Sequence, residues 1–437
     1  MSNASAPVTK REIGSWCLYD FANSVFTTLI VTFVFSLYFA RAVHGDEVEG
    51  AIMWTRAVNI SAVIVALTTP VLGAIADYSG RKKLFLLLAT LQAIIFTLFL
   101  FFVGPGMATV AAVLFIIANV GFEGAQVFYN AFLPEISTTK NIGRISGYGW
   151  GLGYFAGFLT LVIALGMVSW LPEGGSFNVR STVLLVAGWY AVFSIPVFAY
   201  LRERGKPPEA DPEPGSYIRE GFRRVADTFR HLRHYREAAK MLAARLIYND
   251  GLVTIIVMAA IYTGAVYGMD ESDNIKLGIM LNVGAAVGAL SFGFVNDWIG
   301  GKWTIAITLV VLIAAGLLGA TSESRLGFWV AAAAISLMLG PNQSASRSLL
   351  GVFVPREKQG EFFGFFAFSG KLSSVAGPFV YGTVLSMTGN HRLAMVSVVG
   401  FFVVGLIVLL SVDEKAGIET AQSPVPHDVE SSPLVDP

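Results

Sequence analysis

Long apolar stretches restrict what this sequence can fold into more than any other feature. A stretch of about 20 residues with few or no charges is the length of helix that crosses the hydrocarbon core of a bilayer. Twelve such stretches lie near residues 13–42, 52–77, 82–104, 107–133, 144–170, 181–201, 241–268, 275–297, 303–320, 326–353, 359–388 and 391–412. Only 14% of the 437 residues are charged, whereas a soluble domain carries about 25%. The sequence therefore predicts an all-α integral membrane protein with twelve transmembrane helices.

The longest polar break divides the predicted helices into two sets of six. It covers residues 202–240, which leaves an N-terminal half over 1–201 and a C-terminal half over 241–412. If both termini are cytoplasmic, 21 of the 30 Lys and Arg residues fall in cytoplasmic segments and only five in the opposite loops. Cytoplasmic loops of membrane proteins carry such an excess of positive charge. We therefore expect both termini in the cytoplasm.

Two segments outside the apolar stretches have patterns of their own. The break over 202–240 starts as a Pro-rich linker. It then places apolar side chains at helical spacing among arginines: Tyr217, Phe222, Val225, Phe229 and Leu232. This pattern is typical of a basic amphipathic helix on the inner membrane surface, and a solvated connector fits it equally well. Residues 413–437 are rich in Pro, Ser and acidic residues, so we expect a disordered cytoplasmic tail.

Two short segments repeat between the halves. GAIADYSGRK at 73–82 and GFVNDWIGGK at 293–302 share Gly, Asp, Gly and Lys at matching positions, 220 residues apart. Each lies at a predicted cytoplasmic turn, after helix 2 or after helix 8. A repeat at one offset is typical of two parallel six-helix halves. We interpret the following positions as a gating motif and its copy: Gly73, Asp77, Gly80, Arg81 and Lys82, and Gly293, Asp297 and Gly300.

The first of these segments resembles the loop motif between helices 2 and 3 of the major facilitator superfamily, and the second resembles its degenerate copy. The resemblance covers all twelve apolar stretches and implies the two-half major facilitator fold. The chemistry suits a gate, because Gly73 permits close helix approach, Asp77 can cap or pair at a helix end, and Gly80 permits a tight turn. The positive-inside bias alone is the alternative explanation of the basic residues at 81–83.

Further motifs narrow the resemblance. They are WCLYDFANS at 16–24, SRS at 346–348, EFFGFF at 361–366 and SGKLSSVAGP at 369–378. Together they resemble the branch that contains the autophagy-related vacuolar amino-acid effluxers and their bacterial homologues. This resemblance implies amino-acid export as a candidate activity and leaves the direction of transport open. With the compact length, it implies a bacterial cytoplasmic membrane, and a vacuolar membrane is the alternative.

Polar residues inside the apolar stretches fall on particular helices. Residues three and four positions apart share one helical face, and four such stripes occur, on predicted helices 1, 4, 7 and 10. The stripes are Asp20, Asn23, Ser24 and Thr27; Asn119, Glu123, Gln126 and Asn130; Arg245, Tyr248 and Asn249, with Asp250 beside them; and Asn342, Gln343, Ser346 and Arg347. Those four helices line the central cavity in the fold that the sequence resembles. A solute pathway explains charges at this depth, whereas hydrogen bonding between helices explains only the Asn and Ser residues well.

Charged residues of the predicted pathway have candidate roles. Asp20 could bind a substrate amine, carry a coupling proton or pair with a basic residue such as Arg245. Glu123 has no cation at its own helical spacing, so it is our first candidate for the proton carrier. Lys371, near the middle of predicted helix 11, needs an anion, which a substrate carboxylate or a Glu or Asp partner can supply. We expect Lys371 to bind the carboxylate of a zwitterionic solute while Asp20 or Asp250 binds the amine.

These observations predict a secondary active transporter in the lipid bilayer. We expect it to move a small polar solute, an amino acid or similar zwitterion, by alternating access coupled to protons, and to act as a monomer. The alternatives are a transporter-like receptor or scaffold, and a transporter of a lipid. The sequence holds no H-E-x-x-H, G-x-S-x-G or P-loop motif and no Cys/His cluster, so we expect no enzyme, metal or cofactor. Formal net charge is zero, which gives no reason to expect nucleic acid.

Overall fold

A computed structural model describes residues 7–204 and 216–423, and the regular elements of these residues are helices. The N-terminal half contains α1 (Lys10–Val25), α2 (Phe35–Tyr38), α3 (Glu47–Ser79), α4 (Lys82–Phe99), α5 (Ala108–Ala131), α6 (Leu133–Ile136), α7 (Ile142–Trp170) and α8 (Phe177–Tyr200). The rest of the chain contains α9 (Ser216–Arg230), α10 (Arg236–Tyr267), α11 (Glu271–Ile299), α12 (Gly301–Thr321), α13 (Arg325–Phe353), α14 (Gln359–Leu372), α15 (Ala376–Thr388), α16 (His391–Leu410) and α17 (Glu414–Gln422). Shorter helical segments are η1 (Phe26–Phe33), η2 (Phe39–His44), η3 (Leu100–Phe102), η4 (Gly174–Ser176) and η5 (Arg356–Lys358).

Ten continuous helical segments of the described residues are long and apolar enough to cross a bilayer. They correspond to predicted helices 1 to 9 and 12. Predicted helix 10 is α13, whose second half carries a polar stripe, and predicted helix 11 is broken into α14 and α15, each too short to span alone. With α13 and the α14–α15 pair, the chain has the twelve segments and the two six-helix halves that the sequence predicts.

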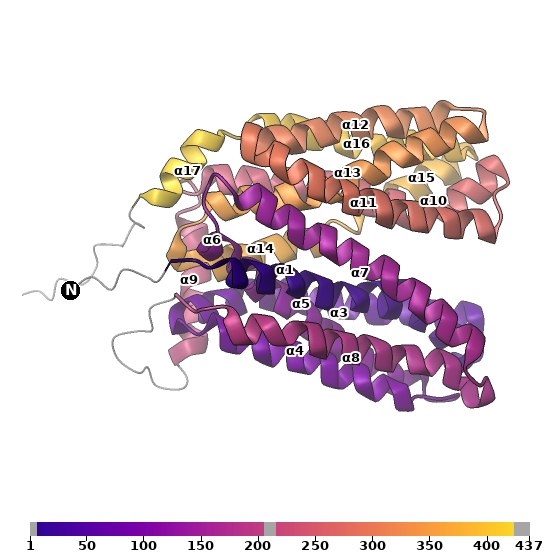
Figure 1. The fold of residues 1–437 in the computed structure, drawn as a ribbon. Coiled ribbons are helices and arrows are strands. Elements are labelled where there is room, and N and C mark those ends of the chain that lie inside the picture. The colour runs from indigo at the N-terminus through magenta and orange to yellow at the C-terminus, as the bar shows by residue number, and fades with distance from the viewer. Residues whose placement is uncertain (1–6, 205–215, 424–437) are drawn as a thin grey trace, which may run out of the picture.

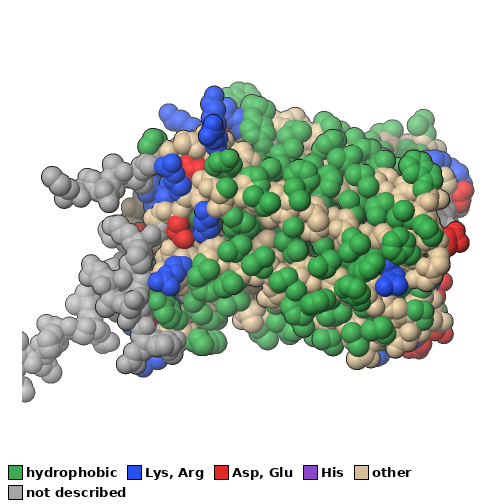
Figure 2. Space-filling model, turned by 60° about the horizontal axis from the view of Figure 1, so that its bottom comes forward, with side chains coloured by type: hydrophobic (Ala, Val, Ile, Leu, Met, Phe, Trp, Pro, Cys, Tyr) green, Lys and Arg blue, Asp and Glu red, His purple; other side chains and the backbone are tan. Residues whose placement is uncertain are grey.

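The two halves form two bundles that lie side by side (Figure 1). α1 begins at the end of the molecule at which α6, α9 and α17 also lie, and we call this the terminal end. On the face that Figure 2 shows, the surface is mostly apolar over the middle of the bundle, and Lys and Arg side chains gather at the terminal end. An apolar belt between charged ends is the surface that a bilayer-spanning protein presents.

The prediction of a disordered tail is wrong for its first part. There the chain forms α17, which the Asp413 side chain caps at its N-terminus. The Glu414 carboxylate accepts hydrogen bonds from the amides of Gly301 and Lys302, at 2.9 and 3.1 Å, and so holds the first turn of α12. Caps of this kind stabilise helix ends, and composition alone does not reveal them. Residues 424–437 of the predicted tail lie outside the described residues.

Helix α9 lies where the amphipathic pattern places a helix, and it contacts both halves. Its Tyr217 and Arg224 pack on Tyr78 of α3, with ring centroids 5.8 Å apart and the guanidinium 4.9 Å from the ring. Near its other end, the Thr228 hydroxyl accepts a hydrogen bond from Lys358 of the C-terminal half at 2.6 Å. α9 therefore bridges the halves at the terminal end. Residues 205–215 of the predicted linker lie outside the described residues.

Glycines form a seam between the halves along α7 and α11. A Cβ atom on Gly147 would overlap the carbonyl oxygen of Ala289, and one on Gly151 would lie 2.6 Å from Leu290. These positions leave no room for a methyl group, so the close approach of the two helices depends on glycine.

We expect Gly147→Ala to lower the free energy of unfolding by about 1–3 kcal/mol, because overpacking a tight interface forces the backbone to shift. Gly188→Ala in α8 is the matched control, since a Cβ at Gly188 meets nothing within 4 Å. Alanine is favoured over glycine inside a helix by about 0.8–1.0 kcal/mol, so the control should not lose stability. Thermal unfolding of both purified variants measures the difference, and equal melting temperatures would contradict a tight seam.

Candidate functional site

The halves meet closely at the terminal end, where α3 packs on α14. A Cβ atom on Gly73 would overlap the carbonyl oxygen of Gly360, so the two backbones touch. Asp77 accepts hydrogen bonds from the amides of Gly360 and Glu361, both at 2.9 Å. A carboxylate is favoured at a helix N-terminus, so Asp77 of one half caps α14 of the other half.

Lys82 is the centre of a buried polar cluster beside this contact. Its Nζ atom lies 3.3 Å from the Asp77 carboxylate, 2.8 Å from the Glu135 carboxylate and 2.9 Å from the side-chain oxygen of Gln359. Only Gln359 belongs to the C-terminal half, so the cluster ties the two halves together. Arg81, in contrast, is exposed, which agrees with the positive-inside explanation for that residue.

The second copy of the motif makes the same contact in the opposite direction. Asp297, near the end of α11, accepts hydrogen bonds from the amide of Gly143 at 2.8 Å and from Arg144 Nε at 2.5 Å. It therefore caps α7 of the N-terminal half. Each carboxylate of the repeat holds the first turn of a helix in the other half, and this reciprocal arrangement closes the terminal end.

At the other positions of the two motif copies, the glycines have the same structural role in both halves, whereas the lysines differ. Gly80 and Gly300 have φ angles of 63° and 91°, in the left-handed region that glycine adopts most easily. A Cβ atom on Gly293 would lie 3.0 Å from the Cα atom of Arg144, so this glycine also permits close approach. Lys302 differs from Lys82, because its Nζ atom donates to two backbone carbonyls of its own half.

A cavity of about 460 Å³ lies between the two halves. Ligand pockets for small molecules commonly enclose about 300–1,000 Å³, so the cavity is large enough for a small solute. Nine of the predicted pathway residues line it: Asp20, Asn23, Glu123, Gln126, Asn130, Arg245, Asn249, Gln343 and Lys371. They come from α1, α5, α10, α13 and α14, which are predicted helices 1, 4, 7, 10 and 11.

Five residues of the stripes do not line the cavity: Asn119, Tyr248, Asp250, Asn342 and Ser346. Asp250 accepts hydrogen bonds from the amides of Gly377 at 2.7 Å and Ala376 at 3.1 Å, and so caps α15. Asn342 is fully buried and donates to the hydroxyl of Thr308 in α12 at 2.9 Å. Asp250 thus supports the break in predicted helix 11, and Asn342 lies on a face of α13 that packs against its own half.

Asp20 pairs with a basic residue of the facing half, which is one of the three roles considered for it, but the residue is Arg347 and not Arg245. Arg347 Nη1 lies 2.9 Å from Asp20 Oδ2, and both side chains are buried. The guanidinium also donates to the hydroxyl and the carbonyl of Ser146, and it lies 4.8 Å from the ring centroid of Trp16. Because the pair joins α1 to α13, it must break when the halves separate at this end.

Glu123 and Lys371 form a second ion pair between the halves. Both side chains line the cavity and are partly exposed within it, at 18% and 27%. Lys371 lies in the last turn of α14, directly before the break that Asp250 supports. Glu123, which has no cation on its own helix, receives one from the opposite half.

Arg245 presents a third cation to the cavity. Its guanidinium stacks on the Phe366 ring at 3.6 Å and donates to the Phe366 carbonyl and to the Ser369 hydroxyl. Among the described residues, no carboxylate forms an ion pair with Arg245, and its Nε atom has no acceptor. A buried cation without an acid partner favours an anionic group in the adjoining cavity.

Sequence reasoning missed several cavity residues. These are Trp150, Tyr154, Asn282 and Phe366, together with Arg347, which was placed in a stripe without a role. The glycine-rich run over 147–157 offered a signal, because glycines at 149 and 153 let α7 approach α1 beside the aromatic residues. The indole Nε1 of Trp150 has no acceptor among the described residues, so it is a free donor in the cavity wall.

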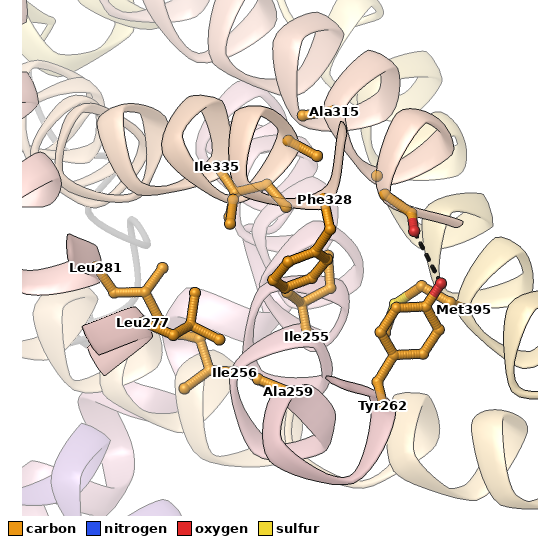
Figure 3. Close-up of a pocket in the computed structure, with 14 residues that line it drawn as sticks. Ile255, Ile256, Ala259, Tyr262, Leu277, Leu281, Ala315, Phe328, Ile335 and Met395 are labelled. Atoms are coloured by element: carbon orange, nitrogen blue, oxygen red, sulfur yellow. Dashed lines mark hydrogen bonds between the residues drawn. The ribbon is translucent and has the colours of Figure 1, made fainter. Parts of the chain in front are cut away.

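A separate apolar cavity of about 50 Å³ lies inside the C-terminal half (Figure 3). Ile255, Leu277 and Phe328 are among its walls, and the Tyr262 hydroxyl beside it donates to the carbonyl of Gly319 at 2.8 Å. None of the residues around it is charged, so it offers a polar solute no partner. The polar chemistry is concentrated in the cavity between the halves.

The fold and the site define the class of protein: a membrane transporter with two six-helix halves and a charged cavity between them. Residues 42–422 match the family model described as "Vacuole effluxer Atg22 like". The MFS-type transporter YxiO of Bacillus subtilis is 30% identical over 435 residues, which cover 95% of this chain and 97% of the relative. The chain therefore belongs to the Atg22-like family of the major facilitator superfamily.

More distant relatives and solved structures agree. Autophagy-related protein 22 of Yarrowia lipolytica is 25% identical over 70% of this chain and 56% of the relative. The human organic anion transporter TETRAN has a TM-score of 0.73 at 15% identity, over 92% of this chain and 99% of that one. FucP in its outward conformation has a TM-score of 0.69 at 14% identity, over 92% and 98%. At these identities the two structures show the shared fold alone.

Proposed function

We propose that this transporter moves a small zwitterionic solute, an amino acid or a similar compound, by alternating access between its two halves. The Glu123–Lys371 pair carries the proposal, because it joins the halves across the cavity. A zwitterion can replace such a pair, with its ammonium group on Glu123 and its carboxylate on Lys371. A neutral sugar would offer neither charge.

Two further groups support a carboxylate on the solute. Arg245 supplies a cation without an acid partner among the described residues, and Trp150 supplies an indole donor. The charged cavity residues are Asp20, Glu123, Arg245, Arg347 and Lys371, which leaves one cation in excess. This excess favours an anionic group on the solute beside these cations, and the ammonium group of a zwitterion leaves the total charge of the site unchanged.

Proton coupling follows from the same pair. A proton on Glu123 removes its charge and frees Lys371, as a bound ammonium group does. The proton and the solute therefore compete for the Glu123 carboxylate. Such competition couples movement of the proton in one direction to movement of the solute in the other. With the terminal end in the cytoplasm, as the Lys and Arg bias predicts, proton entry then drives solute efflux.

A thermal-unfolding screen of purified protein against amino acids, dipeptides, sugars and organic anions tests which class of solute binds. A ligand at a hundredfold excess over Kd stabilises the folded state by about 2.7 kcal/mol. We expect a zwitterion to stabilise wild type, and to bind Lys371→Ala at least about tenfold more weakly, because a charged hydrogen bond contributes about 1.5–3 kcal/mol.

Lys276→Ala is the matched control for that screen. Lys276 is 63% exposed and pairs with Asp273 three residues away, outside the cavity. The control should bind as wild type does. Unchanged affinity in Lys371→Ala for every stabilising zwitterion would overturn the assignment of Lys371 to the carboxylate.

A further inference from the structure

We propose that an anionic phospholipid binds in an apolar crevice at the terminal end, between α9, α10 and α14. The crevice has a volume of about 210 Å³ and includes Phe229 and Leu232, Ala243 and Leu246, and Phe365 and Phe368. The only polar groups among its lining side chains are the hydroxyls of Thr228 and Ser369, and both already form hydrogen bonds. Such walls suit an acyl chain rather than a polar solute.

The position of the crevice exposes it to lipid. Its walls include residues from the first three turns of α10 and of α14, which both belong to membrane-spanning segments. Phe229 is 60% and Leu232 is 45% exposed, although they lie against these helices. Apolar side chains of an interfacial amphipathic helix are covered by the boundary between headgroups and acyl chains.

The basic residues around the crevice favour an anionic lipid headgroup. Residues 216–240 carry seven Lys and Arg against three Asp and Glu. Arg230 follows Phe229 and is 74% exposed, Arg233 follows Leu232, and Arg236 is 68% exposed on the first turn of α10. Asp227 pairs with Arg230, and Glu237 pairs with Arg236 and Lys240, so a headgroup phosphate competes with these carboxylates for two of the three arginines. The excess of exposed cations favours an anionic lipid over zwitterionic phosphatidylcholine.

A lipid in this crevice contacts α9 and two helices of the C-terminal half together. α9 also packs on Tyr78 of the N-terminal half, and its Thr228 hydroxyl accepts a hydrogen bond from Lys358 of the C-terminal half. The lipid therefore holds α9 in its bridging position and stabilises closure of the terminal end.

Native mass spectrometry of protein titrated with phosphatidylglycerol or phosphatidylcholine tests the site. Wild type should retain phosphatidylglycerol in preference to phosphatidylcholine. Arg230→Gln/Arg233→Gln/Arg236→Gln should weaken phosphatidylglycerol binding by about fivefold to a hundredfold, at about fivefold for each cation near the surface, because Arg230 and Arg236 are also paired with acids. Ala243→Trp fills the crevice and should weaken both lipids.

The matched control is Lys10→Gln/Arg11→Gln/Lys140→Gln, which removes three exposed cations from the same end outside the crevice. It should bind phosphatidylglycerol as wild type does. Equal losses in the two triple variants would overturn the proposal in favour of diffuse charge attraction. Unchanged binding in Ala243→Trp, or displacement of the lipid by inorganic phosphate alone, would also overturn it. The melting temperature of each variant without lipid confirms that it is folded.

Discussion

Asp20→Ala should lower the free energy of unfolding by about 3–5 kcal/mol, because it leaves a buried guanidinium without its anion. Arg347 is 2% exposed, and the Asp20 carboxylate is its partner in the only ion pair that it forms among the described residues. The Ser146 contacts remain, but they supply neutral oxygens. Denaturant unfolding in mixed micelles measures the loss.

The double variant Asp20→Ala/Arg347→Met distinguishes the loss of the ion pair from the cost of leaving the Arg347 guanidinium buried without an anion. Replacing a buried ion pair by apolar groups is often nearly neutral, so the double variant should recover most of the lost stability. A single variant that loses less than about 1 kcal/mol, which is typical of exposed pairs, would contradict the burial of this pair.

Asp77→Asn should open the terminal end. The carboxylate accepts two amide hydrogen bonds from α14 and contacts Lys82, so its charge holds the two halves together. Hydrogen bonds to charged groups contribute about 1.5–3 kcal/mol, so the open population should rise at least about tenfold. Spin labels on exposed Lys140 and Arg356, one in each half, report the opening as a longer distance by electron paramagnetic resonance.

Asp46→Asn is the matched control for this shift. Asp46 also accepts two amide hydrogen bonds at a helix N-terminus, from Val48 and Glu49, but all three residues belong to the N-terminal half. Its loss should leave the distance distribution unchanged. The same shift in both variants would show that general destabilisation, rather than the contact between halves, moves the labels.

The repeat and the polar stripes could be predicted from the sequence because both are periodic. Asp77 and Asp297 occupy equivalent positions in the two halves, and they cap equivalent helices. The stripe that begins on α1 and three of the four stripe residues of α5 face the cavity, because three- and four-residue spacing fixes one side of a helix. The fourth, Asn119, instead donates to Ser61 of α3. What periodicity does not fix is the rotation of each helix against its neighbours, so Asn342 was placed in the cavity although it faces α12.

Pairings between halves could not be predicted, because they depend on which residues meet at the same depth. Arg245 was named as one possible partner of Asp20 because the two residues lie at similar depths, whereas Arg347 forms the pair and Gly149 leaves space beside it. The break between α14 and α15 was missed for a similar reason. It is stabilised by Asp250, 126 residues away in the chain, and local sequence holds only a weak signal for it.

Solute flux in liposomes tests the central claim most directly. A zwitterion that binds the purified protein should enter liposomes loaded with the same solute by saturable exchange, and a pH gradient should change the rate. Glu123→Gln should reduce the exchange rate at least about tenfold, because the solute loses a charged hydrogen bond that contributes about 1.5–3 kcal/mol to binding. The variant should also lose the response to pH. Binding without saturable flux would contradict transport, and a wild-type pH response in Glu123→Gln would contradict the role of this carboxylate.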